Sequence, residues 1–157
     1  MAKTYRYLAG FTLLSQVKAD GLKTIPVAAS ISIAKGDVLH KANGYGTNAT
    51  TAFEHGLLGV AVAAVDNSAG GAGAKSIQYI PYLDGYRFIV AVEQNALITQ
   101  AAVGTLVDLQ SVNTIDINDA VVAAPGFFIE EIDVSADAIA VNARGYAIGH
   151  FEVGAPA

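Results

Sequence analysis

Apolar and polar side chains alternate with a period of two residues along much of this chain, which is the pattern of half-buried β-strands. Ile31–Ile33 and the segment from Val112 to Ile117 show the alternation most clearly. Further strands are expected at Leu57–Val65, Thr105–Leu109, Phe127–Val134, Ile139–Asn142 and Tyr146–Val153. Short helical turns are expected at Thr50–Glu54 and Leu97–Ala102. The pattern therefore predicts a mainly β protein: a single compact β-barrel or β-sandwich-like domain with few short helical turns.

The clearest local element is a β-hairpin that the sequence predicts around Asp84-Gly85. The runs Ile77–Leu83 and Tyr86–Val92 flank this dipeptide, and Asp-Gly favours a type I′ turn because both central residues need a positive φ. Proline cannot donate a hydrogen bond to a neighbouring strand. Pro81 therefore indicates that the first strand of the hairpin lies at a sheet edge or carries a bulge.

Residues 1–30 differ from the rest of the chain because they show no clean alternation. They contain the aromatic residues Tyr5, Tyr7 and Phe11 and four of the nine lysines and arginines. Residues 1–41 hold six of the nine basic residues but two of the fourteen acids, so a basic start precedes an acidic remainder. Two interpretations stay open: an extended N-terminal arm (residues 1–30) on a β domain (residues 31–157), or an ordinary first strand of that domain.

Composition limits the class of protein. The 157 residues correspond to about one average domain. Hydrophobic residues make up 53% of the chain and charged residues 15%, so its surface is expected to be poor in charge. Either apolar surface contacts a partner, or the many alanines raise the apolar count while lying in solvent. The chain has no cysteine, no apolar run long enough for a membrane span and no signal-peptide pattern at its start, so we expect a cytosolic product that binds no membrane.

No local motif predicts a catalytic, cofactor-binding or metal-binding residue. His40, His55 and His150 do not lie at metal-ligand spacings from one another and are expected to be structural polar residues. Residues 67–73 lie between two expected strands and are expected to form a flexible surface loop. The run at residues 70–76 is followed by an expected strand and not by the helix that a phosphate loop needs. The basic residues are too dispersed for nucleic-acid binding. We therefore expect no enzyme activity, no cofactor, no metal and no nucleic-acid partner.

The order of strands and turns resembles the decoration, or cement, proteins that tailed bacteriophages add to the outside of their capsids. The resemblance is carried by Gly36-Asp37-Val38-Leu39, the apolar run from Gly56 to Val62, the hairpin from Ile77 to Val92, and the runs Thr105–Leu109, Phe127–Ile129 and Tyr146–Ile148. It implies a non-enzymatic virion structural protein, made in the host cytoplasm, that forms homotrimers on the capsid exterior and bridges subunits of the major capsid protein.

The basic, aromatic start of the chain and the resemblance together predict which residues bind the partner. These are Tyr5, Arg6, Tyr7, Phe11 and Lys18. Aromatic side chains usually contribute most of the energy of an interface, whereas charges at its rim mainly speed association.

Two other classes of function stay open at this point. One is another phage virion component, such as a tail-tube or head-completion subunit, because these also use β-barrels with extended arms. The other is a carbohydrate-binding β module that would use Tyr45, Tyr79, Tyr82 and Tyr86.

Overall fold

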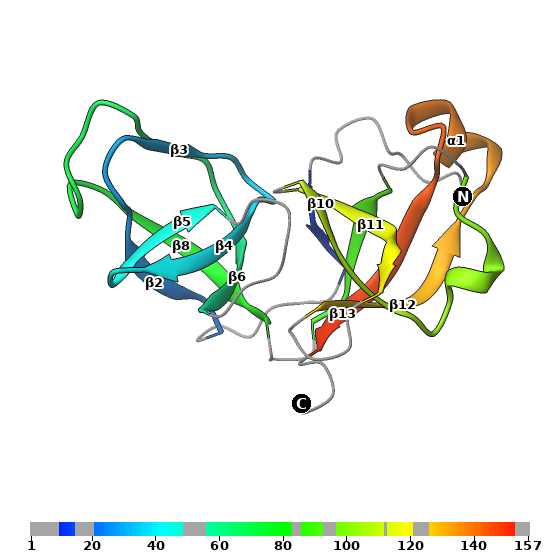
Figure 1. The fold of residues 1–157 in the computed structure, drawn as a ribbon. Helices are drawn as coiled ribbons and strands as arrows, with labels where there is room; N and C mark the ends of the chain where they lie inside the picture. Colours follow the sequence, from blue (N-terminus) through cyan, green and yellow to red (C-terminus); the bar gives the residue numbers. More distant parts are fainter. Residues whose placement is uncertain are drawn as a thin grey trace.

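The computed structural model describes residues 10–14, 21–48, 56–82, 86–92, 97–111, 113–120 and 126–152. This part of the chain is mainly β, with antiparallel sheets and one short α-helix (Figure 1). Two larger sheets form a sandwich-like domain, and neither closes into a complete barrel within these residues. No helix among them is long and apolar enough to cross a membrane. The prediction of a mainly β fold is confirmed in its sandwich-like form.

Sheet A, on the right of Figure 1, has six antiparallel strands in the order β1-β9-β13-β12-β10-β11. The strands are β1 (Thr12–Leu13), β9 (Phe88–Ala91), β10 (Leu106–Ser111), β11 (Thr114–Ala120), β12 (Gly126–Asp133) and β13 (Tyr146–Glu152). The pairing of β12 with β13 runs from Gly126 opposite Glu152 to Asp133 opposite Tyr146. The strands predicted at Phe127–Val134 and Tyr146–Val153 are therefore confirmed.

Sheet B, on the left of Figure 1, has five antiparallel strands in the order β2-β8-β6-β4-β5. The strands are β2 (Lys23–Pro26), β4 (Val38–Ala42), β5 (Tyr45–Asn48), β6 (Leu57–Ala61) and β8 (Ser76–Pro81). A separate pair joins β3 (Ile31–Ile33) to β7 (Val65–Asn67). The strand expected at Leu57–Val65 is thus divided between two sheets. Asn43 and Gly44 connect β4 to β5 with φ values of 52° and 88°, as a type I′ turn requires.

The predicted hairpin around Asp84-Gly85 is wrong, because the strands that flank this dipeptide belong to different sheets. β8 pairs with β2 and β6 in sheet B, whereas β9 pairs with β1 and β13 in sheet A. The dipeptide itself lies outside the described residues. β8 is an inner strand, but its pairing with β2 ends at Tyr79, before Pro81. Pro81 therefore lies beyond the part of β8 that pairs with β2, so its missing N–H does not interrupt that pairing.

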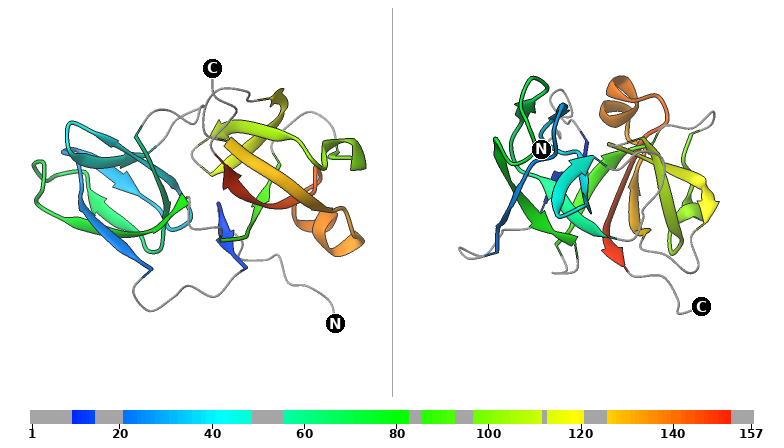
Figure 2. Two further views of the ribbon diagram at one scale, coloured as in Figure 1. Left: turned by 90° about the horizontal axis from the view of Figure 1, so that it is seen from below. Right: turned by 60° about the vertical axis from the view of Figure 1, so that its left-hand side comes forward.

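Both sheets curl until distant strands approach one another, as the two views of Figure 2 show. In sheet B, Val27 forms an isolated bridge to Gly46 of β5, and in sheet A, Val92 forms one to Ile115 of β11. An open strand edge would offer unpaired backbone groups to other chains. The curling therefore covers part of each sheet edge within the chain.

Helix α1 (Ala136–Val141) corrects the prediction of a strand at Ile139–Asn142. Ser135 caps its first turn, because the side-chain oxygen accepts a hydrogen bond from the N–H of Ala138 at 3.4 Å. Ala138 packs onto the outer face of sheet A. The cap and this contact outweigh the local β preference of Ile139 and Val141.

The 3₁₀-helix η2 (Gln100–Ala102) confirms the helical turn predicted at Leu97–Ala102. The turn predicted at Thr50–Glu54 lies outside the described residues.

The main hydrophobic core lies between the two sheets and joins them. Sheet B contributes Val38, Leu57, Val60 and Ile80, and sheet A contributes Phe88, Val90, Val107, Leu109, Ile115, Phe127, Ile129, Ala147 and Phe151. A second cluster lies within sheet B around Leu39 and Ile77. A third lies on the outer face of sheet A, where Ile89, Tyr146 and Ile148 meet α1. Because the main core takes side chains from both sheets, the two sheets form one packed body.

The glycine-rich loop at residues 67–74 is held in place by hydrogen bonds, contrary to the expectation of a flexible segment. Asn67 is 2% exposed, and its Nδ2 donates to the carbonyl oxygens of Ala28 at 2.8 Å and Gly71 at 3.1 Å. The N–H of Gly73 donates to the carbonyl oxygen of Val27 at 2.9 Å. These contacts join the loop to the segment that follows β2.

Candidate interaction surface

The structure describes one of the five residues predicted to bind a partner. Tyr5, Arg6, Tyr7 and Lys18 lie outside the described residues, so their assignment stays a prediction. Phe11 is 2% exposed and belongs to the main core. Its assignment to a partner-binding surface is therefore corrected: the side chain is buried within its own chain.

Phe11 reaches the core because the backbone on either side of it is held close to both sheets. Its N–H donates to the carbonyl oxygen of Gly36 at 3.0 Å, and a Cβ on Gly10 would lie 2.4 Å from the same oxygen. Gly10 has a φ of 66°, which a residue with a side chain rarely adopts. The ring of Phe11 then meets Phe127 and Phe151 at centroid distances of 5.4 and 5.2 Å.

The described residues also correct the predicted boundary at residue 30 between an arm and a β domain. β1 pairs with β9 in sheet A, and β2 pairs with β8 in sheet B. Residues 12–13 and 23–26 are therefore parts of the sheets, as the alternative of an ordinary first strand expects. Residues 1–9 and 15–20 lie outside the described part.

Charge divides between the two sheets more clearly than between an arm and a body. Residues 86–152, which form sheet A apart from β1, hold Arg87 and Arg144 against nine acids. Residues 21–82, which form sheet B and the β3–β7 pair, hold four lysines against three acids. The side chains of Lys23 and Lys41 are exposed. The folded body therefore has an acidic sheet A beside a weakly basic sheet B.

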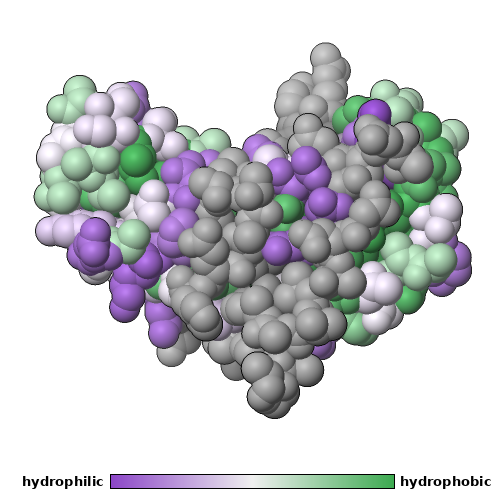
Figure 3. Space-filling view, in the orientation of Figure 1, coloured by the Kyte–Doolittle hydropathy of each residue, from purple (hydrophilic) through white to green (hydrophobic). Residues whose placement is uncertain are grey.

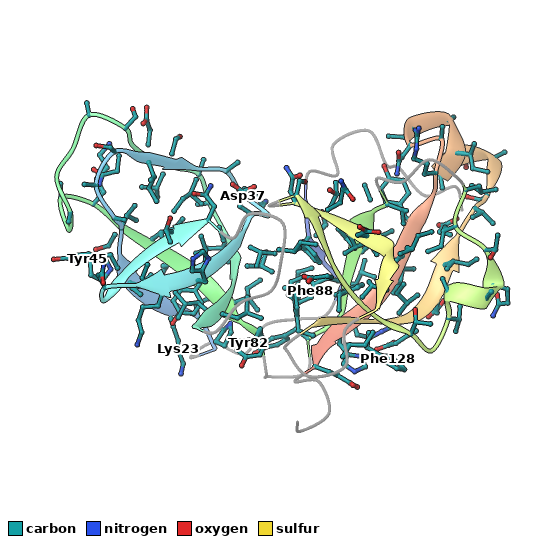
Figure 4. The ribbon with its side chains drawn as sticks, viewed as in Figure 1. Lys23, Asp37, Tyr45, Tyr82, Phe88 and Phe128 are labelled. Atoms are coloured by element: carbon teal, nitrogen blue, oxygen red, sulfur yellow. The ribbon has the colours of Figure 1, made fainter. Side chains whose placement is uncertain are left out.

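The outer face of sheet A carries a cluster of charged side chains that we call the His150 cluster: Arg87, Glu130, Glu131, His150 and Glu152. His150 lies opposite Phe128 across β12 and β13, and Glu152 follows two residues later on the same face. Figure 4 places Phe128 near the lower end of sheet A.

A bulge in β12 brings two of the carboxylates to this face. The register shifts between Ile129 and Glu131, so that one extra residue stands in β12 opposite β13. Ile129 and Ile132 both pack toward the main core. The side chains of Glu130 and Glu131, which lie between these two isoleucines, therefore both point outward. Strict alternation along a strand would have placed them on opposite faces.

The contacts of the His150 cluster form a continuous chain. Nδ1 of His150 lies 2.5 Å from Oε1 of Glu130, and Nε2 lies 2.7 Å from Oε1 of Glu152. Nε of Arg87 donates to Oε2 of Glu130 at 2.9 Å, and Nη2 donates to Glu131 at 2.7 Å. The ring of Phe128 packs against the imidazole at a centroid distance of 5.2 Å. These contacts hold the imidazole and the guanidinium in place.

The electrostatics of the cluster favour the charged forms of its members. Burial by itself lowers the pKa of His150, but the hydrogen bonds to Glu152 and Glu130 outweigh it, so the pKa is raised above its usual value. Burial by itself raises the pKa of Glu130, but the hydrogen bonds from His150 and Arg87 outweigh it, so this pKa is lowered. The hydrogen bond to Glu131 and the charge of Glu130 raise the pKa of Arg87.

The His150 cluster presents a polar, net acidic surface to the outside. The side chains of Glu131, Glu152 and Arg87 are 59%, 44% and 41% exposed. Both nitrogens of His150 are engaged by carboxylates of the same chain. Among the described residues, no group of three or more histidine, aspartate or glutamate side chains could hold a metal ion. The arrangement therefore displays charges in fixed positions on the outer face of sheet A.

Sequence reasoning missed this cluster because it searched the histidines for metal-ligand spacings. The usable signal was the spacing of His150 and Glu152, two residues apart on a strand that the pattern predicted. The position of Glu130 depends on the bulge, and Arg87 directly precedes β9, in a segment that the pattern assigned to a hairpin.

The four tyrosines suggested for carbohydrate binding do not form a shared platform. Tyr79 lies in the core cluster of sheet B and Tyr86 lies in the main core, and both are less than a tenth exposed. Tyr45 and Tyr82 are half-buried and lie in different parts of the molecule (Figure 4). The residues that this alternative invoked are thus dispersed or buried.

The apolar character of the described surface comes largely from alanine. The large hydrophobic side chains exposed in this part of the chain are Leu14, Leu22, Leu97 and Val141. Exposed alanines include Ala63, Ala64, Ala72, Ala101, Ala136 and Ala140. Figure 3 shows hydrophilic residues along the lower edge of the sheet B side, whereas much of the right-hand margin over sheet A is hydrophobic. For these residues, the interpretation based on alanine is the better one.

Comparison with known proteins does not assign the chain to a family: no protein-family model matches it, and a search of curated proteins finds no matching sequence. Its function is therefore argued from its residues, its fold and its surface.

Proposed function

We propose that this chain is a non-enzymatic virion structural protein that decorates and stabilises the outside of a tailed-bacteriophage capsid by bridging subunits of the major capsid protein. The resemblance in the order of strands and turns supports the proposal, as does the mainly β, sandwich-like fold. The hairpin from Ile77 to Val92 no longer counts in its favour. The remaining support comes from Gly36–Leu39 at the start of β4, from the apolar strand β6, and from strands β10, β12 and β13.

The observation that carries the proposal is the division of charge over a body whose two sheets share one core. The exposed Lys23 and Lys41 lie on the less acidic sheet B, and the sequence places further basic residues before it. Opposite charge on two surfaces speeds their encounter and orients them. A capsid exterior is commonly acidic, so we expect sheet B to face the shell and the acidic sheet A to face away from it.

The proposed assembly is a homotrimer. A ring around an axis normal to the shell keeps sheet B of every copy toward the capsid, and head-to-tail contacts between copies close into such rings when the rotation allows. Tyr5, Arg6, Tyr7 and Lys18 remain the residues proposed to contact the partner, and Phe11 is removed from that set because it belongs to the core.

Binding to undecorated capsids tests the function directly. Purified protein is mixed with heads of the cognate phage that lack decoration, and bound protein is measured by co-sedimentation and electron microscopy. We expect saturable binding at regular sites, and a trimeric mass by light scattering. Absence of binding would contradict the proposal, and rings or tubes formed without capsids would favour a tail-tube subunit instead.

A pair of matched variants tests whether strands β2 and β4 of sheet B face the shell. Lys23→Gln with Lys41→Gln removes two charges from β2 and β4, whereas Lys35→Gln with Lys75→Gln removes two charges from the turns between strands. We expect the first variant to slow association and to reduce its salt dependence more than the second. Equal effects would contradict a contact made by strands β2 and β4 themselves.

A further inference from the structure

The imidazole of His150 lies between two carboxylates that can only accept hydrogen bonds when they are ionised. Nδ1 faces Glu130 on β12 at 2.5 Å, and Nε2 faces Glu152 on β13 at 2.7 Å. Both ring nitrogens must therefore carry a proton for both contacts to form. A neutral imidazole has one N–H, so it would turn a lone pair toward one of the two carboxylates. The geometry is complete only with the imidazolium ion.

The same contacts join three neighbouring strands of sheet A. Arg87 directly precedes β9 and reaches across β13 to Glu130 and Glu131 on β12. His150 then links Glu130 to Glu152 at the end of β13. Directly beneath them, Phe127 pairs with Phe151, and both rings lie in the main core. The charged contacts therefore lie over the end of the β12–β13 pairing that covers the aromatic core.

The charged groups that face His150 are accounted for within the described residues. Glu130 and Glu131 come from β12 and Glu152 from β13, and Arg87 directly precedes β9. Helix α1 covers the opposite end of this face, where Asp133 lies opposite Tyr146 on the neighbouring strand. Asp133, at the end of β12, therefore pairs with β13 four positions before His150.

We propose that His150 is a proton-controlled clasp, which fixes the end of β13 to β12 while its imidazole is charged and loosens that end when the imidazole becomes neutral. The clasp acts within the folded chain, so it does not depend on the proposed capsid function. Its opening also makes the outer face of sheet A more acidic, because the positive charge of the imidazolium is lost while Glu130 and Glu152 remain ionised.

The direction of the pH dependence follows from the two groups. The pKa of His150 is raised above 6.5, so its contribution is complete below pH 6.5 and is lost as the pH rises through the raised value. The pKa of Glu130 is lowered below 4.5, so its contribution is complete above pH 4.5 and is lost as the pH falls through the lowered value. The clasp is therefore fully closed in mildly acidic solution and opens on the alkaline side.

Titration of His150 by NMR, followed through its ring protons, tests the clasp in the whole chain. We expect a pKa above the ordinary value, and we expect Glu152→Gln to lower it by about one unit because an adjacent opposite charge is removed. Glu131→Gln is the matched control: it removes the same charge from the same cluster but does not touch the imidazole. A pKa at or below the ordinary value, or equal shifts in the two variants, would overturn the proposal.

Hydrogen exchange measures whether the end of β13 loosens. We expect exchange at the amides of Phe151 and Glu152, corrected for its intrinsic pH dependence, to rise about tenfold as His150 loses its proton, the scale expected for one lost charge-assisted hydrogen bond. In His150→Gln this extra rise should disappear. In Glu152→Gln, which retains the imidazole, it should move to lower pH. Exchange that stays constant through the titration of His150 would refute the clasp.

Discussion

Replacing Phe11 by alanine tests directly whether the first described residues are core or partner-binding surface. The Phe11 side chain is 2% exposed, and its ring lies 6.4, 5.4 and 5.2 Å from the rings of Phe88, Phe127 and Phe151. These three neighbours belong to β9, β12 and β13. The substitution therefore removes one ring from a four-ring cluster in the main core. A residue that only anchored a partner would leave the stability of the isolated chain unchanged.

The magnitude follows from the cavity that the missing ring leaves. Truncation of a buried phenylalanine to alanine costs about 3–5 kcal/mol, because the lost transfer free energy adds to the cost of the cavity. Three paired strands line this cavity and are held by backbone hydrogen bonds, so little collapse is expected and the cost should lie near the upper value. A domain of this size is stable by about 5–15 kcal/mol, so the substitution removes a large part of that stability.

Urea unfolding followed by circular dichroism and tyrosine fluorescence measures the effect. Since the denaturant slope is about 1–3 kcal/mol per molar, a loss of this size moves the midpoint by more than about 1 M. Phe11→Leu keeps most of the apolar volume and should cost less than about 1.5 kcal/mol. Leu14→Ala is the control, because that side chain is 50% exposed, and it should change stability by no more than about 0.5 kcal/mol. Equal midpoints for Phe11→Ala and Leu14→Ala would refute the core assignment.

Buried polar groups and glycines give further expected outcomes. Asp37→Ala removes a buried acceptor from the turn before β4 and should cost about 1–3 kcal/mol in thermal unfolding. Burial raises the pKa of Asp37, so its charge costs stability at neutral pH; Asp37→Asn should match or exceed the parent there and lose that advantage as the solution is acidified. Asn67→Ala removes both donors that anchor the loop at residues 67–74, so limited proteolysis should cut this loop faster. Gly149→Ala would place a Cβ 1.8 Å from the carbonyl oxygen of Phe128, and we expect no soluble folded protein by size-exclusion chromatography.

Local sequence patterns predicted many elements of this fold. A strand with one buried face has a side-chain period of two, and the patterns at Ile31–Ile33, Phe127–Val134 and Tyr146–Val153 each correspond to an observed strand. The helix α1 was missed although its signal is local, since Ser135 provides the cap that begins it. For the candidate site, the spacing of His150 and Glu152 was also readable as one face of a predicted strand.

The sequence by itself therefore determined the β class, the positions of most C-terminal strands and the uneven distribution of charge, because these depend on neighbouring residues alone. Only the tertiary structure decided that β8 and β9 join different sheets, that Phe11 completes the core, and that Glu130 faces His150. Each of these outcomes selects one partner among several strands or side chains with similar local patterns. That selection depends on which packing of distant segments buries the most apolar surface without leaving backbone groups unpaired. The alternation of neighbouring residues does not specify this packing.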